Sequence, residues 1–478
     1  MPGDRTGKDH TLILGAGPAG MAAAFELNKE GNEFTVIEKT DSVGGLARTF
    51  SYGEYITDLG PHRFFSQNKY LYDFIKDLLG DRWIKVNRLT RFYINDKFFM
   101  YPIEIKNALK NVGPYTAGRI VADYSFERLR ERFAKRELRS FEDHVVSDFG
   151  RELAKLNMLN YTEKVWGLPC SEISPDWADQ RIRGLSFFAV IKNALHKSDK
   201  GPKTLVDQFY YPEMGTGTIY EEIKKRVEEG TSGAFALGSH PTRVAHDGKR
   251  ITEVSVKTPG GEKKFSPGNV VSSIPITVLL ELLDPGPPKG IMEAAGRLKF
   301  RSHVFLFITL DRKTVFPDQW IYFPNKEIPF GRVMEPRNFS AKLSPAGKTS
   351  LLIEFFCWEN DRVWNATTEA LFDIGVQPLE DRNFIKRSEI TGSFSHREKY
   401  AYPVYDLDYR KNLDPVRDYL KAFANLQLIG RAGSFRYNNQ DHAMEMGILA
   451  ARSIIENKQY NLDDVGAEKS YFESGYIK

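Results

Sequence analysis

Cysteine is scarce in this chain of 478 residues, which contains only Cys170 and Cys357, at distant positions. This scarcity excludes a disulfide framework and a cysteine-rich metal site, and it favours the reducing environment of the cytoplasm. An excess of one charge is also missing, because 67 lysines and arginines are balanced against 63 acidic residues. The net charge of +4 gives no general field for attracting nucleic acid or an anionic membrane, so we expect neither as a partner. Any anion-binding site must be local.

Long hydrophobic runs are absent too, and so are the motifs of common hydrolases. Residues 12–25 are apolar, but three glycines and a proline interrupt them, and no other run approaches the roughly 18 residues of a membrane-spanning helix. The nine histidines form no HExxH motif and no GxSxG motif occurs, so we expect neither a metal site nor a serine nucleophile. Aromatic residues, at 13%, are plentiful enough for a deep pocket or for a large core.

The N-terminal part has the pattern of a strand, a glycine turn, a helix and a second strand. Residues 11–15 predict a buried strand, residues 18–30 a helix, and residues 34–38 the next strand. The pattern therefore predicts a βαβ unit, the building block of a Rossmann-like domain.

A GxGxxG motif, formed by Gly15, Gly17 and Gly20, joins the predicted strand to the helix. The first glycine permits a tight turn, the second lets the backbone approach a pyrophosphate, and the third lets the helix pack close to the strand. Glu38 ends the second strand, where its carboxylate can accept hydrogen bonds from a ribose. The motif predicts dinucleotide binding, and the alternative is a purely structural glycine turn.

A second glycine pair, Gly44 and Gly45, follows closely and precedes Arg48. A guanidinium at this place can reach the pyrophosphate that the first turn holds. The stretch VIEKTDSVGGLAR resembles the FAD fingerprint of the superfamily of amine oxidases, protoporphyrinogen oxidases and UDP-galactopyranose mutases. The resemblance implies FAD rather than NAD as the cofactor; the alternative is a surface turn with a solvated arginine.

The C-terminal part extends this resemblance, because residues 428–452 are similar to the segment that returns to the FAD domain in the superfamily. Val244 matches a residue that contacts the adenine through its backbone, although a plain core valine is an equal alternative. Together the matched motifs imply one set of FAD-binding residues: Gly15, Gly17, Ala19, Gly20, Glu38, Lys39, Gly45, Leu46, Arg48, His62, Val244, Gly430, Arg431, Asn439, Gln440, Asp441 and Met444.

These patterns predict an α/β fold with a discontinuous, Rossmann-like FAD-binding domain, a helical insertion and an antiparallel-sheet substrate domain. Alternating segments with Asp247-Gly248 and Gly260-Gly261 turns predict a β meander in the middle of the chain. The expected divisions are residues 1–68, 205–290 and 420–460 for the FAD-binding domain, 69–204 for the mainly helical insertion, 291–419 for the substrate domain and 461–478 for a tail.

Several central stretches are similar to the galactopyranose mutases, especially the eukaryotic type. GPHRFF resembles the mutase loop that brings a histidine, here His62, close to the flavin. The stretches around Arg181 and Arg332 resemble segments whose arginines hold the nucleotide diphosphate. Two guanidinium groups suit a diphosphate, whereas either arginine alone would favour an ordinary surface or ion-paired role, and a structural histidine is the alternative for His62.

The same resemblance supplies further active-site residues. Tyr322, Tyr402, Tyr437 and Asn439 match mutase active-site positions. Two departures from the mutase pattern bear on the identity of the sugar. Phe339 stands where a diphosphate-binding tyrosine is expected, and the spacing from Tyr437 to the NQDH stretch is two residues shorter. The implied activity is that of a nucleotide-sugar pyranose/furanose mutase, in which N5 of reduced FAD attacks the anomeric carbon and NAD(P)H can serve as external reductant.

Two other functions compete with the mutase prediction. A FAD-dependent oxidoreductase of the amine oxidase or protoporphyrinogen oxidase type would transfer a hydride from its substrate to the flavin. A non-catalytic flavoprotein is the third class. The turn around Gly215 and Gly217 predicts either a hinge that closes over substrate or a static entry to a helix.

Overall fold

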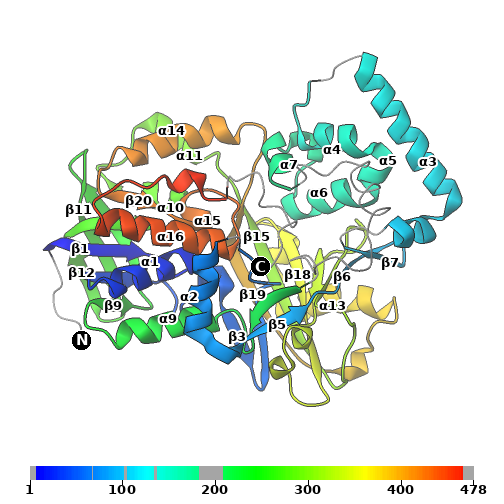
Figure 1. Ribbon diagram of the computed structural model, residues 1–478, viewed down its shortest axis with the longest axis horizontal. Helices are drawn as coiled ribbons and strands as arrows, with labels where there is room; N and C mark the ends of the chain where they lie inside the picture. Colours follow the sequence, from blue (N-terminus) through cyan, green and yellow to red (C-terminus); the bar gives the residue numbers. More distant parts are fainter. Residues whose placement is uncertain (1–6, 67, 102–104, 134–136, 182–207, 467–478) are drawn as a thin grey trace.

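The computed structural model describes residues 7–66, 68–101, 105–133, 137–181 and 208–466 (Figure 1). Residues 182–204 of the expected helical insertion and residues 467–478 of the expected tail lie outside the described residues. The described chain forms a parallel sheet between layers of helices, a large and mainly antiparallel sheet, and a group of helices beside that sheet. This arrangement confirms the predicted α/β fold class.

The parallel sheet is built from strands that lie far apart in the sequence. Its order is β20 (Leu426–Leu428), β13 (Pro267–Ser272), β1 (Gly7–Leu14), β2 (Phe34–Ile37) and β9 (Gly233–Ala236). All four pairings are parallel. Consecutive residues Leu12, Ile13 and Leu14 are fully buried, because helices cover both faces of such a sheet.

The two faces of this sheet carry different helices (Figure 1). Ile13 belongs to one apolar cluster, whereas Leu12 and Leu14 belong to another. Four helices contribute to the first cluster: α1 (Pro18–Lys29), α2 (Lys69–Leu79), α9 (Thr218–Glu228) and α16 (Gln440–Ile455). Three contribute to the second: α10 (Ile276–Glu281), α11 (Lys289–Ala295) and α14 (Tyr409–Lys421).

A small four-stranded sheet packs on the second cluster and corresponds to the predicted β meander. Its order is β12 (Gly261–Phe265), β11 (Ile251–Thr258), β10 (His240–His246) and β14 (Leu283–Asp284). The turns at Asp247-Gly248 and Gly260-Gly261 join antiparallel neighbours, as their sequence predicts. Two further strands, β3 (Thr49–Tyr52) and β4 (Tyr55–Asp58), form a hairpin.

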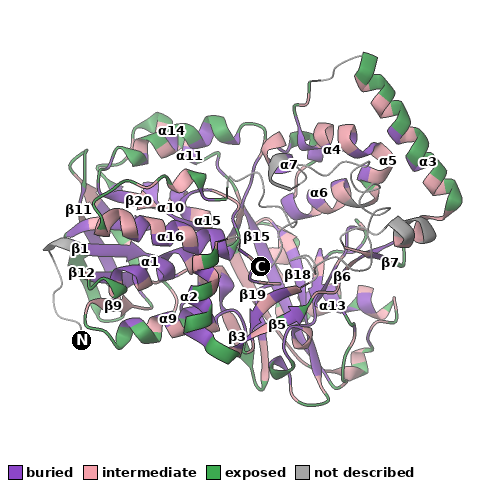
Figure 2. Cartoon of the chain, viewed as in Figure 1, coloured by how far each residue is buried: buried purple, intermediate pink, exposed green. Residues whose placement is uncertain are grey.

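The large sheet has seven strands and a heavily aromatic core. Its order is β19 (Ile390–Pro403), β15 (Phe300–Leu310), β18 (Thr349–Cys357), β17 (Arg332–Met334), β16 (Trp320–Tyr322), β6 (Thr90–Ile94) and β7 (Lys97–Met100). Helices α12 (Arg362–Asn365) and α13 (Thr368–Glu380) lie against it. Buried residues concentrate along the sheets, and exposed residues along the outer helix faces (Figure 2).

The segment predicted to be a mainly helical insertion, residues 69–204, also contributes strands to two sheets. This segment contains β6 and β7, which extend the large sheet, and β5 (Trp83–Asn87), which pairs with β8 (Gln208–Pro212). The hairpin of β6 and β7 turns at Asn95 and Asp96, whose φ angles are 48° and 59°. Such an Asn-Asp pair is a hairpin signal that the sequence contains.

The helical group follows these strands. It comprises α3 (Ile105–Phe133), α4 (Phe141–Phe149), α5 (Arg151–Ala154), α6 (Asn160–Trp166) and α7 (Pro175–Arg181). Helix α3 runs along the outer edge of the molecule and is interrupted at Gly113, whose φ is 75° (Figure 1). No helix within the described ranges is both long and apolar enough to cross a membrane.

A close contact between α1 and α16 joins the two ends of the chain. A Cβ atom added to Gly447 would lie 2.0 Å from the carbonyl oxygen of Ala19. We therefore expect Gly447→Ala to lower the free energy of unfolding by about 2–3 kcal/mol, because the helices must separate to admit the methyl group. Thermal unfolding followed by circular dichroism measures the change.

Gly118→Ala is the matched control, because Gly118 also lies in a helix and a Cβ there meets nothing within 4 Å. We expect this variant to be as stable as the parent or slightly more stable. Equal melting temperatures for the two variants would contradict the importance of the helix contact.

Candidate functional site

The first glycine turn has the geometry of an anion-binding turn. Gly15 has a φ of 98°, and Gly17 is the N-cap residue of α1. A Cβ atom on Gly20 would lie 2.0 Å from the carbonyl oxygen of Gly15, so only glycine allows the helix to start this close to the strand. The amide groups at the start of α1 therefore open at the carboxyl edge of the parallel sheet.

Glu38 follows β2 and holds this turn in place. Its carboxylate accepts hydrogen bonds from the amide of Ala16 at 2.8 Å and from the amide and hydroxyl of Thr40, both at 2.9 Å. A carboxylate has about four acceptor sites, so three local bonds leave capacity for one more donor. The residue expected to bind a ribose thus also fixes the loop on which a ribose would lie.

The second glycine pair packs directly against the first turn. The amide of Gly44 donates to the carbonyl of Ala16 at 2.8 Å, and a Cβ on Gly45 would lie 2.9 Å from the Cα of Gly17. The buried Arg48 forms an ion pair with Glu398 on β19, and its Nε has no hydrogen-bond partner among the described residues. Two glycine motifs separated in sequence therefore form one backbone cradle.

The C-terminal segment meets this cradle from the other side. Helix α15 (Gly430–Gly433) begins at Gly430, whose φ is 70° and whose added Cβ would lie 3.1 Å from the Cβ of Ala19. Gln440 donates to the carbonyl of His62 at 3.3 Å and accepts from the hydroxyl of Tyr220 at 2.9 Å. The start of α16 is thereby fixed against the GPHRFF loop.

The remaining residues expected to bind the cofactor lie in several settings. Lys39 is exposed, Leu46 is half-buried, and Met444 is in the core beneath α16. Asp441 is buried at the start of α16, and burial raises its pKa well above its usual range. Val244 is buried on β10 and its amide donates to the carbonyl of Leu282 at 2.7 Å, so that amide is already used within the fold.

A charged cluster lies beside the GPHRFF loop and centres on Arg332. The guanidinium of Arg332 pairs with Glu354 on β18, and Nδ1 of His303 lies 3.1 Å from the same carboxylate. The side chains of Arg332 and Glu354 are only 13% and 3% exposed. A Cβ on Gly60 would lie 3.4 Å from Nη2 of Arg332, so the loop that carries His62 passes directly over this pair.

Tyrosines surround this ion pair. Tyr402 and Tyr437 have ring centroids 5.1 Å apart, and the guanidinium of Arg431 lies over both, at 4.9 and 5.2 Å. Tyr322 pairs with Arg332 across the hairpin of β16 and β17. The ring of Tyr161, on α6, lies 5.1 Å from that of Tyr322.

The structure thus brings together five of the predicted site residues: His62, Tyr322, Arg332, Tyr402 and Tyr437. Asn439 is exposed at the N-cap of α16, where its amide donates to His442. Arg181 is the last residue of α7, and its side chain lies outside the described part of the structure. Phe339 packs in an aromatic core against Tyr211, with ring centroids 5.0 Å apart.

Sequence reasoning missed three members of the cluster, namely Tyr161, His303 and Glu354. Glu354 stands alone in the apolar run SLLIEFFCW, and a single acid within a buried strand is a signal of a paired charge. Tyr161 lies within the YTEKVWG stretch that already carried a resemblance. His303 begins the apolar run of β15 and gave no comparable signal.

The buried charges determine the protonation states of their neighbours. Burial, together with Arg431 and Arg332, lowers the pKa of His62 to about 4. Burial acts to raise the pKa of Glu354, but Arg332 and His303 outweigh it and hold that pKa below its usual range. Burial and the adjacent Tyr437 raise the pKa of Tyr402. At neutral pH the cluster therefore contains a neutral His62, an ionised Glu354 and a protonated Tyr402.

The turn at Gly215 and Gly217 is tightly packed. A Cβ on either glycine would come within 3 Å of Thr49, and the amide of Gly217 donates to the hydroxyl of Thr49 at 2.8 Å. Helix α9 begins directly after Gly217. This packing favours a static helix entry over a hinge.

The residues present suit a bound FAD. An added Cβ would come within 3 Å of neighbouring atoms at Gly15 and Gly45, whereas at Gly17 it would meet nothing closer than 4.0 Å. The backbone of Gly17, at the start of α1, is therefore open to a pyrophosphate. Glu38 retains acceptor capacity, and Arg48 retains an unbonded buried Nε. No group of three or more histidine, cysteine or acidic residues in the described chain could hold a metal ion.

Comparison with known proteins identifies the family. The flavin-containing amine oxidoreductase family matches residues 18–455. The chain belongs to this family. FAD is accordingly the cofactor that its membership implies, and the predicted resemblance to the superfamily is confirmed.

Individual relatives are distant and differ in activity. The L-amino acid oxidase bordonein-L of Crotalus durissus terrificus is 22% identical over 354 residues, which cover 67% of this chain but 64% of that relative. A solved structure of reduced UDP-galactopyranose mutase has a TM-score of 0.83 at 22% identity and covers 98% of both chains. A proposed protoporphyrinogen oxidase from Exiguobacterium sp. 255-15 has a TM-score of 0.70 at 15% identity, covering 95% of this chain and 99% of that one. The two solved structures, that of the mutase and that of the protoporphyrinogen oxidase, therefore have the same fold as this chain.

The depressed pKa of His62 predicts a pH dependence of stability. Its folded-state pKa of about 4 lies below the ordinary value of 6.5, so its contribution to stability is present above pH 6.5 and is lost as the pH falls toward 4. The free energy of unfolding of the parent should therefore fall between pH 7.5 and pH 5. In His62→Ala it should fall by up to about 2 kcal/mol less.

Thermal unfolding of the flavoprotein at several pH values measures this effect. His240→Ala is the control, because His240 is exposed, and it should leave the pH dependence of the parent unchanged. A His62 variant with the same pH dependence as the parent would contradict a neutral imidazole at this place.

Proposed function

We propose that the protein is a FAD-dependent nucleotide-sugar mutase that interconverts pyranose and furanose forms, similar to UDP-galactopyranose mutase. The observation that carries this proposal is the buried Arg332, fixed by Glu354 and surrounded by the hydroxyl groups of Tyr161, Tyr322 and Tyr402. Such a cluster suits a diphosphate, which needs fixed donors in a partly dry pocket. The similarity in fold to the mutase supports the same assignment.

The charges of the cluster favour an anionic ligand. Arg332 and Glu354 compensate each other, His62 is neutral, and Arg431 adds a positive charge that Tyr402 and Tyr437 cover. The described part of the cluster therefore has a local charge of about +1, which the near-balanced total charge does not predict.

Each residue has a distinct role in the proposed reaction. Reduced FAD, when bound, supplies the nucleophile through its N5 atom. Arg332 and Arg181 hold the nucleotide diphosphate while it is the leaving group, and Tyr402 and Tyr437 donate to its phosphate oxygens. Glu354 orients Arg332, and the neutral His62 supports the flavin-facing loop without competing for the diphosphate.

An amino acid or amine oxidase is the second candidate function. The sequence relative named above, bordonein-L, is an L-amino acid oxidase, and a buried arginine also suits the carboxylate of an amino acid. In that reaction the substrate would transfer a hydride to oxidised FAD. The two functions differ in the flavin state that they require.

The flavin state gives a direct test. Dithionite-reduced protein incubated with UDP-galactose and other nucleotide sugars should form a product of equal mass, separable by anion-exchange chromatography, and oxidised protein should form none. NAD(P)H should replace dithionite under anaerobic conditions if it is the external reductant. Peroxide release by oxidised protein with an amino acid or amine, and no isomerisation by reduced protein, would establish the oxidase instead.

Substitution of the two arginines tests the diphosphate site. Arg332→Ala and Arg181→Ala should each weaken UDP binding about 30- to 100-fold and leave the FAD content unchanged, because charge-assisted bonds to phosphate are lost. Fluorescence titration with UDP measures the affinity. Arg130→Ala is the control, since Arg130 lies on the exposed helix α3 and its side chain is 56% exposed. Unchanged affinity in both site variants would remove the argument for a diphosphate.

A further inference from the structure

One half-buried lysine, Lys164 on α6, binds the loop that joins β16 to β17. Its ammonium group lies within hydrogen-bond distance of four backbone carbonyl oxygens of this loop. They belong to Phe323 at 2.7 Å, Asn325 at 2.6 Å, Ile328 at 2.8 Å and Phe330 at 3.1 Å. The loop therefore curls around a single amino group, whose pKa burial lowers to about 7 and whose charged form the four carbonyl acceptors favour.

The contact matters because of what the loop connects. Tyr322 ends β16, Arg332 begins β17, and the two residues are direct partners across this hairpin. Each of these strands has only three residues, so the ladder between them is short, although β6 and β18 flank the hairpin on its two sides. An ammonium group supplies three donors for the four carbonyls, of which that of Asn325 also accepts from the amide of Ile328 at 3.2 Å.

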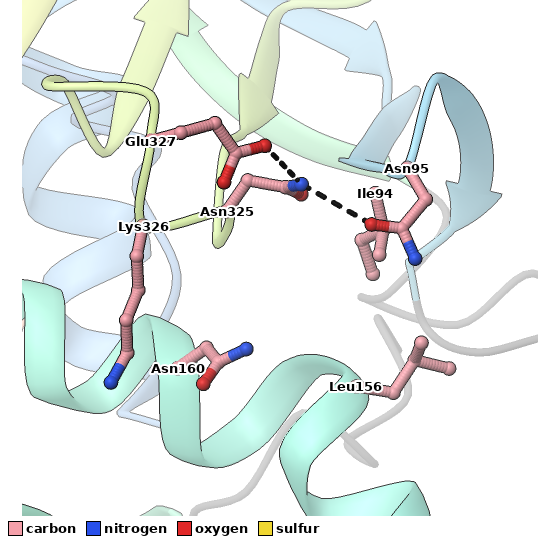
Figure 3. A pocket seen from close by; sticks show the side chains of 7 residues that line it. All are labelled: Ile94, Asn95, Leu156, Asn160, Asn325, Lys326 and Glu327. Atoms are coloured by element: carbon pink, nitrogen blue, oxygen red, sulfur yellow. Dashed lines mark hydrogen bonds between the residues drawn. The ribbon is translucent and has the colours of Figure 1, made fainter.

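The outer side of the same loop is tied more weakly. Lys326 pairs with Glu163 at 2.7 Å, and the side-chain amide of Asn325 donates to Asn95 at 3.3 Å and to Glu327 at 2.7 Å (Figure 3). Asn95, Asn325, Lys326 and Glu327 line a cavity of about 240 Å³ between the loop, α6 and the turn after β6. Lys326 is 67% exposed, and exposed ion pairs contribute little to stability.

We propose that Lys164 is a positioning residue, which fixes the β16–β17 loop and thereby holds Arg332 and Tyr322 in the geometry that binds the diphosphate. Lys164 acts through the backbone of the loop, because its donors are directed to the four carbonyls. The proposal rests on the proposed function of Arg332 in nucleotide binding. In this proposal, nucleotide binding depends on the contact of Lys164, in the helical group, with a loop of the large sheet.

The test replaces the ammonium with an apolar side chain of similar length. Lys164→Met should retain its FAD content and visible flavin spectrum, but bind UDP about tenfold more weakly. Lys326→Met is the matched control: it removes the outer tie of the same loop and should bind UDP as the parent does. If Lys164→Met does not fold, Lys164→Gln, which keeps two donors, replaces it and should weaken UDP binding by a smaller factor.

A double-mutant cycle separates positioning from a general structural role. In an Arg332→Ala background, Lys164→Met should weaken UDP binding by much less than tenfold, since the arginine that it positions is already gone. The proposal would be overturned if Lys164→Met weakened UDP binding by the same factor in both backgrounds. It would also be overturned if Lys164→Met bound UDP as the parent does while Arg332→Ala bound it weakly. If Arg332→Ala itself binds UDP normally, the proposed function fails and the role of Lys164 in it fails with it.

Discussion

The close approach of α1 to α16 is the contact on which the candidate site depends. Backbone meets backbone at Gly447 and Ala19, and the same side of α1 receives Gly430. Because glycine and alanine allow this approach, the C-terminal segment lies across the glycine turn and directs Arg431 and Tyr437 toward the loop of His62. A larger side chain at this contact would displace the flavin cradle and the polar cluster together.

The polar cluster combines parts of the chain that no local rule would bring together. Arg332 comes from a three-residue strand, Glu354 from the centre of the large sheet, and Tyr161 from the helical group. Each buried charge has a partner nearby, which is the condition under which charges remain ionised away from water. The large sheet therefore provides the rigid surface, while the helices and the GPHRFF loop enclose it.

Local patterns predicted much of the fold, and contacts distant in sequence account for what they missed. The βαβ unit, both glycine motifs and the β meander followed from periodicity and turn chemistry. The pairing of β6 with β16 did not, because parallel pairing of distant strands has no signature in either strand. Likewise the motif of Arg48 was recognised, but its ion pair with Glu398 depends on where β19 passes in three dimensions.

The same fold serves oxidases and a mutase among the compared proteins, so the flavin cradle alone does not determine the reaction. What distinguishes the two reactions is the ligand that the side chains around Arg332 can hold. A diphosphate remains bound while its bond to the sugar is broken, which requires donors that stay fixed in both states. Arg332 meets this requirement because Glu354 holds its guanidinium and the lysine-bound loop holds its backbone. This double restraint on a single arginine is the feature on which the proposed mutase function rests.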